Sequence, residues 1–133
     1  MRRVLQPNTW SCFAAAAVMV TGETLEDFYQ FCGHDGSAID TQHPFADGRR
    51  GFRLDEVAGY LAKRGYLLGG PVGHPYCFGT LSILIVKGRT YRHAVVWTGF
   101  RVIDPNPEKP FWMGLRQYQV LEIWPVNKVE VRV

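Results

Sequence analysis

The strongest constraint on the fold is the apolar, alanine-rich run FAAAAVMV, which directly follows Cys12. Alanine favours helix, and a helix over about residues 11–21 would have no polar face, so it must be buried on most sides. Thr9 and Ser11 are the candidate N-cap residues, and Gly22 is a typical helix end. Such a helix belongs at the centre of a domain, with the other elements packed around it.

Two more helices are predicted, on either side of a long loop. Residues 25–32, which end just before Gly33, keep apolar side chains at helical spacing, and so do residues 54–64. The stretch 33–52 between them is rich in Gly, Asp and His and has no clear period. Loops of that length are usually functional or mobile.

The second half of the chain has the pattern of strands. Segments rich in Val, Ile and aromatic residues are predicted as strands at 81–86, 93–98, 100–103, 119–124 and 129–133. Short turns at 87–89 and at Gly99 would join the first three as antiparallel neighbours. Helices followed by antiparallel strands predict an α+β fold, in which the sheet packs against the first helix.

Composition narrows the classes of protein to consider. A chain of 133 residues with 47% hydrophobic content is expected to form a single domain, 1–133, with its own core. The net charge is only +3 and the basic residues are dispersed, so no nucleic-acid partner is expected. An odd total of three cysteines argues against a disulfide framework and favours a reducing, cytoplasmic location. Neither a signal peptide nor a membrane-spanning segment is recognisable, so we expect no membrane partner.

Four residues form a candidate catalytic set. Cys12 lies in the first turn of the predicted helix, where the helix dipole and free N–H groups favour the thiolate, the nucleophilic form. Acyl transfer by a thiol needs a base, and His93 opens the strand-like segment HAVVW. Asp104 follows on the next strand, within reach of His93 across the turn, and would orient its ring. The side-chain amide of Gln6 and the Cys12 N–H are the natural oxyanion donors.

These segments resemble a known family. QPNTWSCFAAAA is similar to the catalytic segment of papain-like cysteine peptidases, where a glutamine precedes the nucleophile at the same spacing. HAVVWTGFRVIDPNP looks more like the C39 peptidase-like branch, in which a histidine-led strand and a short return strand end in Asp-Pro. The resemblance implies a minimal papain-like core, with Cys12 as nucleophile, His93 as base, Asp104 as orienting acid and Gln6 as oxyanion donor. It predicts a small cysteine peptidase that cleaves a peptide, isopeptide or amide bond through a thioester.

The substrate is less well defined by the sequence. C39 members usually carry Asp-Cys-Gly at the nucleophile, whereas this chain has Ser11, Cys12 and Phe13, and it is too short for most of the insertions that form the specificity sites of papain. Trp10, close before the nucleophile, and His74, in a glycine-rich stretch, are the predicted substrate-binding residues. We expect a protein or peptide substrate and no cofactor or metal; the oligomeric state is left open.

Each of these residues also has an interpretation without catalysis. A cysteine that leads a buried helix, such as Cys12, is often simply part of the core. His93 would then be a hydrogen-bonded core histidine, and Asp104 before a proline would be a turn residue. The alternative function is therefore a catalytically inactive papain-fold module that binds or inhibits a host or partner protein.

The other two cysteines raise a third hypothesis. Cys32 and Cys77, together with His34 and His74, supply two thiolates and two imidazoles, which is enough for a tetrahedral zinc site. Neither half has the usual spacing between two thiolates, however, and Cys32 falls on the apolar face of its predicted helix. We therefore favour core packing for both cysteines over a zinc-stabilised interaction domain.

Overall fold

A computed structural model describes residues 1–73, 78–111 and 113–129 of the chain. Its α-helices come first, followed by the strands. The α-helices are α1 (Cys12–Thr21), α2 (Leu25–Cys32) and α3 (Leu54–Lys63). The strands are β1 (Tyr66–Leu68), β2 (Ser82–Lys87), β3 (Arg92–Trp97), β4 (Val102–Ile103) and β5 (Val120–Lys128). Short 3-10 turns occur at Ala46–Gly48 and Leu115–Gln117. The predicted α+β fold is confirmed.

The predicted helices form within one or two residues of their expected bounds. Gly22 and Gly33 end α1 and α2 with a φ angle of 78°, a left-handed conformation that glycine adopts without steric cost. Thr24 caps α2 by accepting a hydrogen bond from the backbone N–H of Asp27. These signals are local, which is why the sequence alone places the ends of both helices.

The strands form an antiparallel sheet in the order β1-β5-β2-β3-β4. β4 is short and pairs with only the end of β3, Val96 with Ile103 and Trp97 with Val102. The start of β3, which carries His93, therefore extends beyond β4 at this edge of the sheet.

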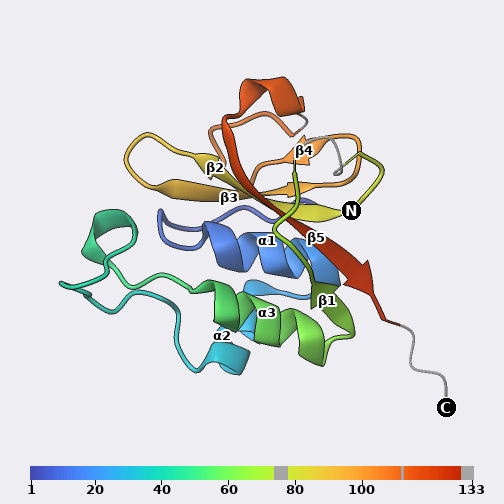
Figure 1. Ribbon diagram of the computed structural model, residues 1–133. Helices are drawn as coiled ribbons and strands as arrows, with labels where there is room; N and C mark the ends of the chain where they lie inside the picture. The colour runs from blue at the N-terminus through green and yellow to red at the C-terminus, as the bar shows by residue number, and fades with distance from the viewer. Residues whose placement is uncertain (74–77, 112, 130–133) are drawn as a thin grey trace, which may run out of the picture.

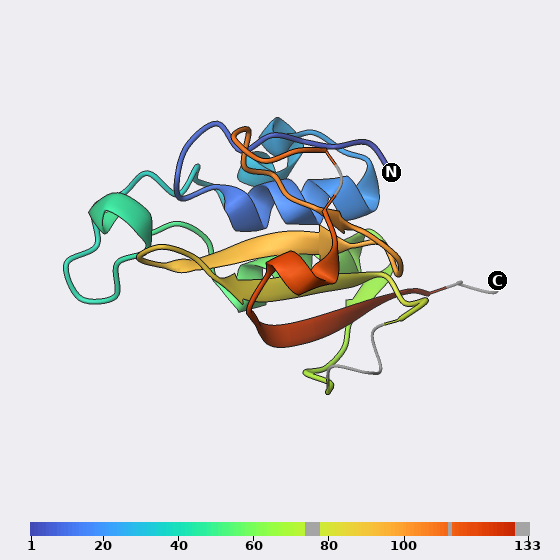
Figure 2. The same ribbon diagram turned by 90° about the horizontal axis from the view of Figure 1, so that it is seen from above.

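The helices gather on one face of the sheet, with α1 packed against β3 (Figure 1). Side chains alternate along the strands, so Ile83, Ile85, Ala94 and Val96 belong to the core on the helical side. Their neighbours Leu84, Val86, Val95 and Trp97 belong to a second apolar cluster on the opposite face. That face is covered by the Leu115–Gln117 turn, drawn in orange-red at the top of Figure 1 and over the strands in Figure 2.

The predicted end of the last core strand at residue 124 is wrong. β5 continues through Pro125 to Lys128, although proline usually ends a strand. Pro125 fits because its carbonyl accepts a hydrogen bond from Gly69, at 2.8 Å, and the next N–H, that of Val126, donates to Leu81, also at 2.8 Å. Pairing is therefore kept on both sides of the proline.

Other strand predictions need smaller corrections. β1 was not predicted, since three residues are too few to show an alternating pattern. The segment 100–103 forms a strand only at Val102–Ile103, because a turn closed by the Thr98 N–H and the Arg101 carbonyl occupies its start. Of the predicted strand 129–133, Val129 lies just beyond β5, and residues 130–133 are outside the described part of the chain.

Candidate active site

Cys12 is the first residue of α1, and only 2% of its surface is exposed. Ser11 occupies the N-cap position, as predicted, but its side chain makes no capping hydrogen bond and lies 3.3 Å from the Tyr29 hydroxyl instead. The backbone N–H groups of the first turn therefore remain available to a negative charge beside them.

His93 and Asp104 meet across the β3–β4 hairpin. Asp104 directly follows β4, which pairs with the end of β3, so its side chain can reach that of His93 near the start of β3. The ring Nε2 of His93 lies 2.7 Å from Oδ1 of Asp104. An ionised carboxylate only accepts hydrogen bonds, so Nε2 carries a proton and Nδ1 is the ring nitrogen left for another partner.

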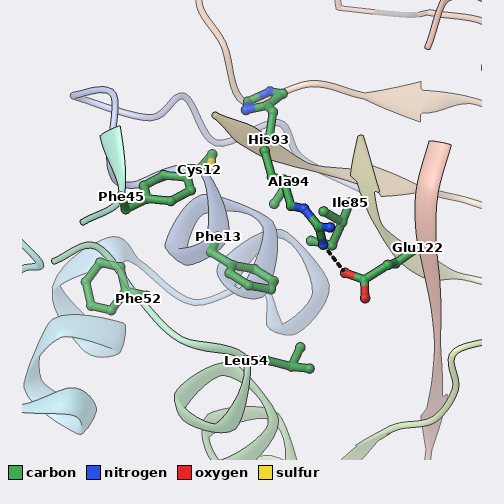
Figure 3. A pocket seen from close by; sticks show the side chains of 10 residues that line it. Cys12, Phe13, Phe45, Phe52, Leu54, Ile85, His93, Ala94 and Glu122 are labelled. Atoms are coloured by element: carbon green, nitrogen blue, oxygen red, sulfur yellow. Dashed lines mark hydrogen bonds and ion pairs between the residues drawn. The ribbon is translucent and has the colours of Figure 1, made fainter. Parts of the chain in front are cut away.

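That other partner is Cys12. Burial by itself lowers the pKa of His93, but hydrogen bonds to Asp104 and to Cys12, and the charges of both, outweigh it and raise the pKa to about 9. The cysteine and the histidine also line the same pocket (Figure 3). The structure thus brings together three of the predicted residues, in the order cysteine, histidine and aspartate.

Asp104 is only 1% exposed, and its carboxylate has several donors. Besides His93, Oδ1 accepts the backbone N–H of Asn106 at 2.8 Å, and Oδ2 accepts the hydroxyl of Tyr118 at 2.7 Å. Burial raises the pKa of Asp104, but the bonds from His93 and Tyr118 outweigh this effect and the net shift is downward. The carboxylate is therefore kept ionised.

Sequence reasoning missed two residues that hold Asp104. One is Tyr118. The other is Arg3, whose guanidinium donates to the backbone carbonyls of Asp104 at 2.9 Å, Asn106 at 2.6 Å and Lys109 at 2.8 Å. Arg3 and Asp104 are about a hundred positions apart and belong to no common motif, so only the folded chain reveals their contact.

Gln6 lies in the same N-terminal segment as Arg3, and this segment runs beside residues 104–106, which we call the aspartate loop. Its backbone N–H donates to the carbonyl of Pro105 at 2.8 Å. Its side-chain Nε2 donates to the carbonyl of Asn8 at 2.9 Å, which leaves a second N–H on this nitrogen. Its Oε1 is buried without a hydrogen-bond partner among the described residues.

A small, mainly apolar pocket of about 190 Å³ adjoins the cysteine and histidine. Its remaining lining residues are Phe13, Phe45, Phe52, Leu54, Ile85, Arg92, Ala94 and Glu122. Arg92 and Glu122 form an ion pair at 3.3 Å, drawn as a dashed line in Figure 3. Phe45 and Phe52 come from the long loop 33–52, so this loop forms part of the pocket wall.

Trp10 faces the loop rather than this pocket. Its indole Nε1 donates to the carbonyl of Asp35 at 3.2 Å, and the guanidinium of Arg49 lies over its ring at 5.4 Å. The hydroxyl of Thr9 also donates to the Asp47 carboxylate. Trp10 therefore connects the loop to the segment before Cys12. His74, the other predicted substrate-binding residue, lies outside the described residues.

The described half of the hypothetical zinc site is engaged in other contacts. Burial and the nearby charge of Glu56 raise the pKa of the Cys32 thiol to about 11, so this thiol stays protonated. His34 Nε2 lies 2.7 Å from Glu56, and its Nδ1 accepts the N–H of Gly36 at 2.9 Å. His74 and Cys77, the other half, are not described, and the described residues hold no group of three or more ligands suited to a metal.

Comparison with known proteins gives one informative result. No family model and no curated protein sequence matches the chain. Among solved structures, the peptidase domain of ComA from Streptococcus, a bi-functional ABC transporter involved in quorum sensing, superposes with a TM-score of 0.65. The alignment covers 96% of this chain and 97% of that domain, at 14% sequence identity.

The fold is that of a papain-like peptidase domain. This confirms the predicted fold class, with the cysteine on a buried N-terminal helix that packs against an antiparallel sheet. At 14% identity the likeness extends to the fold alone. Within the described residues, no helix is both long and apolar enough to cross a membrane.

Proposed function

We propose that this chain is a small cysteine peptidase or related thiol hydrolase, of the C39-like papain type, that cleaves a peptide, isopeptide or amide bond. The observation that carries the proposal is the arrangement around His93. One ring nitrogen is held at 2.7 Å by a buried aspartate, and the thiol of Cys12 is the other partner of the ring. A protonated imidazole with a thiolate beside it is the working form of such a nucleophile.

These positions support the following reaction. His93 Nδ1 takes the proton of Cys12, and the thiolate attacks the carbonyl carbon of the substrate. The oxyanion that forms is stabilised by the Cys12 N–H, at the uncapped start of α1, and by the free side-chain N–H of Gln6. The C–N bond then breaks, the leaving amine takes the proton from His93, and a thioester remains on Cys12. Water attacks this thioester with His93 as base, which releases the acid and restores the thiol.

The pocket beside the thiol defines the class of substrate we propose. Its volume of about 190 Å³ is below that of pockets for whole small molecules, and suits a single side chain of a peptide or protein. The aromatic and aliphatic lining, from Phe13, Phe45, Phe52 and Leu54, favours an apolar side chain next to the scissile bond. A nucleophilic thiol must remain reduced, which supports a cytoplasmic location.

The test compares the reactivity of the cysteines. Iodoacetamide at about pH 6 is expected to label Cys12 faster than Cys32 and Cys77, as measured by mass spectrometry of the digested protein. His93→Ala is expected to abolish this preference, whereas the control His34→Ala, which removes a histidine bonded to Glu56 instead, preserves it. Equal labelling of all three thiols would instead favour the alternative, an inactive papain-fold module that binds a partner.

A further inference from the structure

Asp104 is the buried charge on which the site depends, and its two oxygens are held in different ways. Oδ1 receives two hydrogen bonds, from His93 Nε2 at 2.7 Å and from the Asn106 N–H at 2.8 Å. Oδ2 accepts a hydrogen bond from the Tyr118 hydroxyl at 2.7 Å. Among the described residues, this hydroxyl is the donor to Oδ2. Without that hydroxyl, one oxygen of a nearly fully buried carboxylate would have no partner there.

The Tyr118 hydroxyl has one proton and two acceptors within reach. Met113 Sδ lies 2.8 Å away and Asp104 Oδ2 lies 2.7 Å away. An ionised carboxylate is a much stronger acceptor than a thioether, so the proton is directed to Asp104. Burial and the charge of Asp104 raise the pKa of Tyr118, so the residue remains a donor throughout the neutral range.

The ring of Tyr118 is itself held in place. It follows the Leu115–Gln117 turn and packs, with Met113 and Leu115, against the apolar cluster on the sheet face opposite the helices. The turn is closed by the Gln117 side chain, which accepts the Gly114 N–H at 2.9 Å. A side chain packed on one face of the sheet thus contacts the carboxylate that is bonded to His93.

We infer that Tyr118 is a positioning residue of this site, which fixes the Asp104 carboxylate in the orientation that holds the His93 ring toward Cys12. The inference rests on the proposed function, since it assigns Tyr118 a role in that reaction. Tyr118 touches neither the thiol nor the ring directly in the described contacts. Its effect therefore passes entirely through Asp104.

The experiment removes only the hydroxyl, in Tyr118→Phe. The iodoacetamide labelling rate of Cys12 at about pH 6 is expected to fall roughly tenfold, the effect of losing one hydrogen bond to a charged group. In an Asp104→Ala background the same substitution is expected to change the rate no further, because the residue acts through that carboxylate. Tyr60→Phe is the matched control, since Tyr60 is a buried tyrosine that donates to the Glu23 carboxylate outside the pocket.

A second measurement is independent of reactivity. In NMR titrations of the histidine ring protons, Tyr118→Phe is expected to lower the pKa of His93 from its value of about 9, because a loosened carboxylate holds the imidazolium less well. Tyr60→Phe is expected to lower only the free energy of unfolding. If Tyr118→Phe leaves the labelling rate and the His93 pKa at their wild-type values, the inference is wrong. It is also wrong if Tyr118→Phe slows labelling as much in the Asp104→Ala background as in the wild type.

The two proposals fail in distinguishable ways. If Cys12 of the wild-type protein shows no labelling preference that depends on His93, the proposed function is wrong. If that preference is present and Tyr118→Phe leaves it intact, the function stands and the role of Tyr118 is wrong.

Discussion

His93, near the start of β3, and Asp104, which directly follows β4, are joined through their side chains, with Nε2 of His93 2.7 Å from Oδ1 of Asp104. β4 pairs only with Val96 and Trp97 of β3, so among the described residues no strand lies beside His93 at this edge of the sheet. This edge is where the first turn of α1 brings Cys12. The hairpin thus fixes the orientation of the His93 ring, while the helix carries the thiol of Cys12 beside it.

The stability of the protein should depend on pH through His93. Its folded pKa, about 9, is above the ordinary value of 6.5, so its stabilising contribution is complete below about pH 6.5 and disappears as the pH rises through 9. A shift of this size corresponds to a contribution on the order of 3 kcal/mol. The difference in unfolding free energy between the wild type and His93→Gln, measured with urea, should therefore shrink between pH 6 and pH 10. A constant difference over that range would contradict the raised pKa.

Gln6 should affect acylation but not alkylation. Gln6→Ala is expected to slow acylation of Cys12 by an activated ester about 100-fold, because the oxyanion loses a donor. Alkylation by iodoacetamide forms no oxyanion, so its rate should stay at the wild-type value. Gln30→Ala, at an exposed position of α2, is the control and should change neither rate. Equal losses in both reactions would indicate a structural role for Gln6 instead.

Arg3 should stabilise the aspartate loop from the other end of the chain. Arg3→Ala removes hydrogen bonds to the backbone carbonyls of Asp104, Asn106 and Lys109, and is expected to lower the free energy of unfolding by about 1–3 kcal/mol. Arg2→Ala, at an exposed neighbouring position, should have an effect of less than about 0.5 kcal/mol. Urea unfolding checks both, and equal effects of the two substitutions would show that the contacts of Arg3 do not matter.

The pocket should select side chains by polarity. Short peptidyl chloromethyl ketones with an apolar side chain beside the reactive group are expected to label Cys12 faster than lysine-containing ones. In Leu54→Asp, the ratio of the labelling rate with the apolar reagent to that with the lysine reagent should fall about tenfold, because the substitution puts a carboxylate into the pocket. The substitution suits the first position of α3, where the helix dipole favours an acid. An unchanged preference, with unchanged iodoacetamide labelling, would place the selective contacts elsewhere.

The predictions that succeeded from sequence rest on local signals. The apolar, alanine-rich run after Cys12 and the glycines at 22 and 33 predict α1 and the end of α2. The strand pattern that begins at His93 predicts β3. Of the failures, one has a local cause and another does not. Three-residue β1 is too short to show a pattern, whereas Pro125 is accommodated because Gly69 and Leu81, from other segments of the chain, supply hydrogen-bond partners on either side.

For the candidate site, the sequence by itself determined which residues have the right chemistry and the right order: a thiol on a buried helix, then a histidine, then an acid. The tertiary structure decided which of them meet, which side chains hold them, and which residues line the pocket beside them. Tyr118 and Arg3 contact Asp104 only because the chain folds back on itself, and Trp10 contacts the long loop for the same reason. The preference of a segment for helix or strand depends on its neighbouring residues, whereas hydrogen bonds to a buried charge depend on segments that only folding brings together.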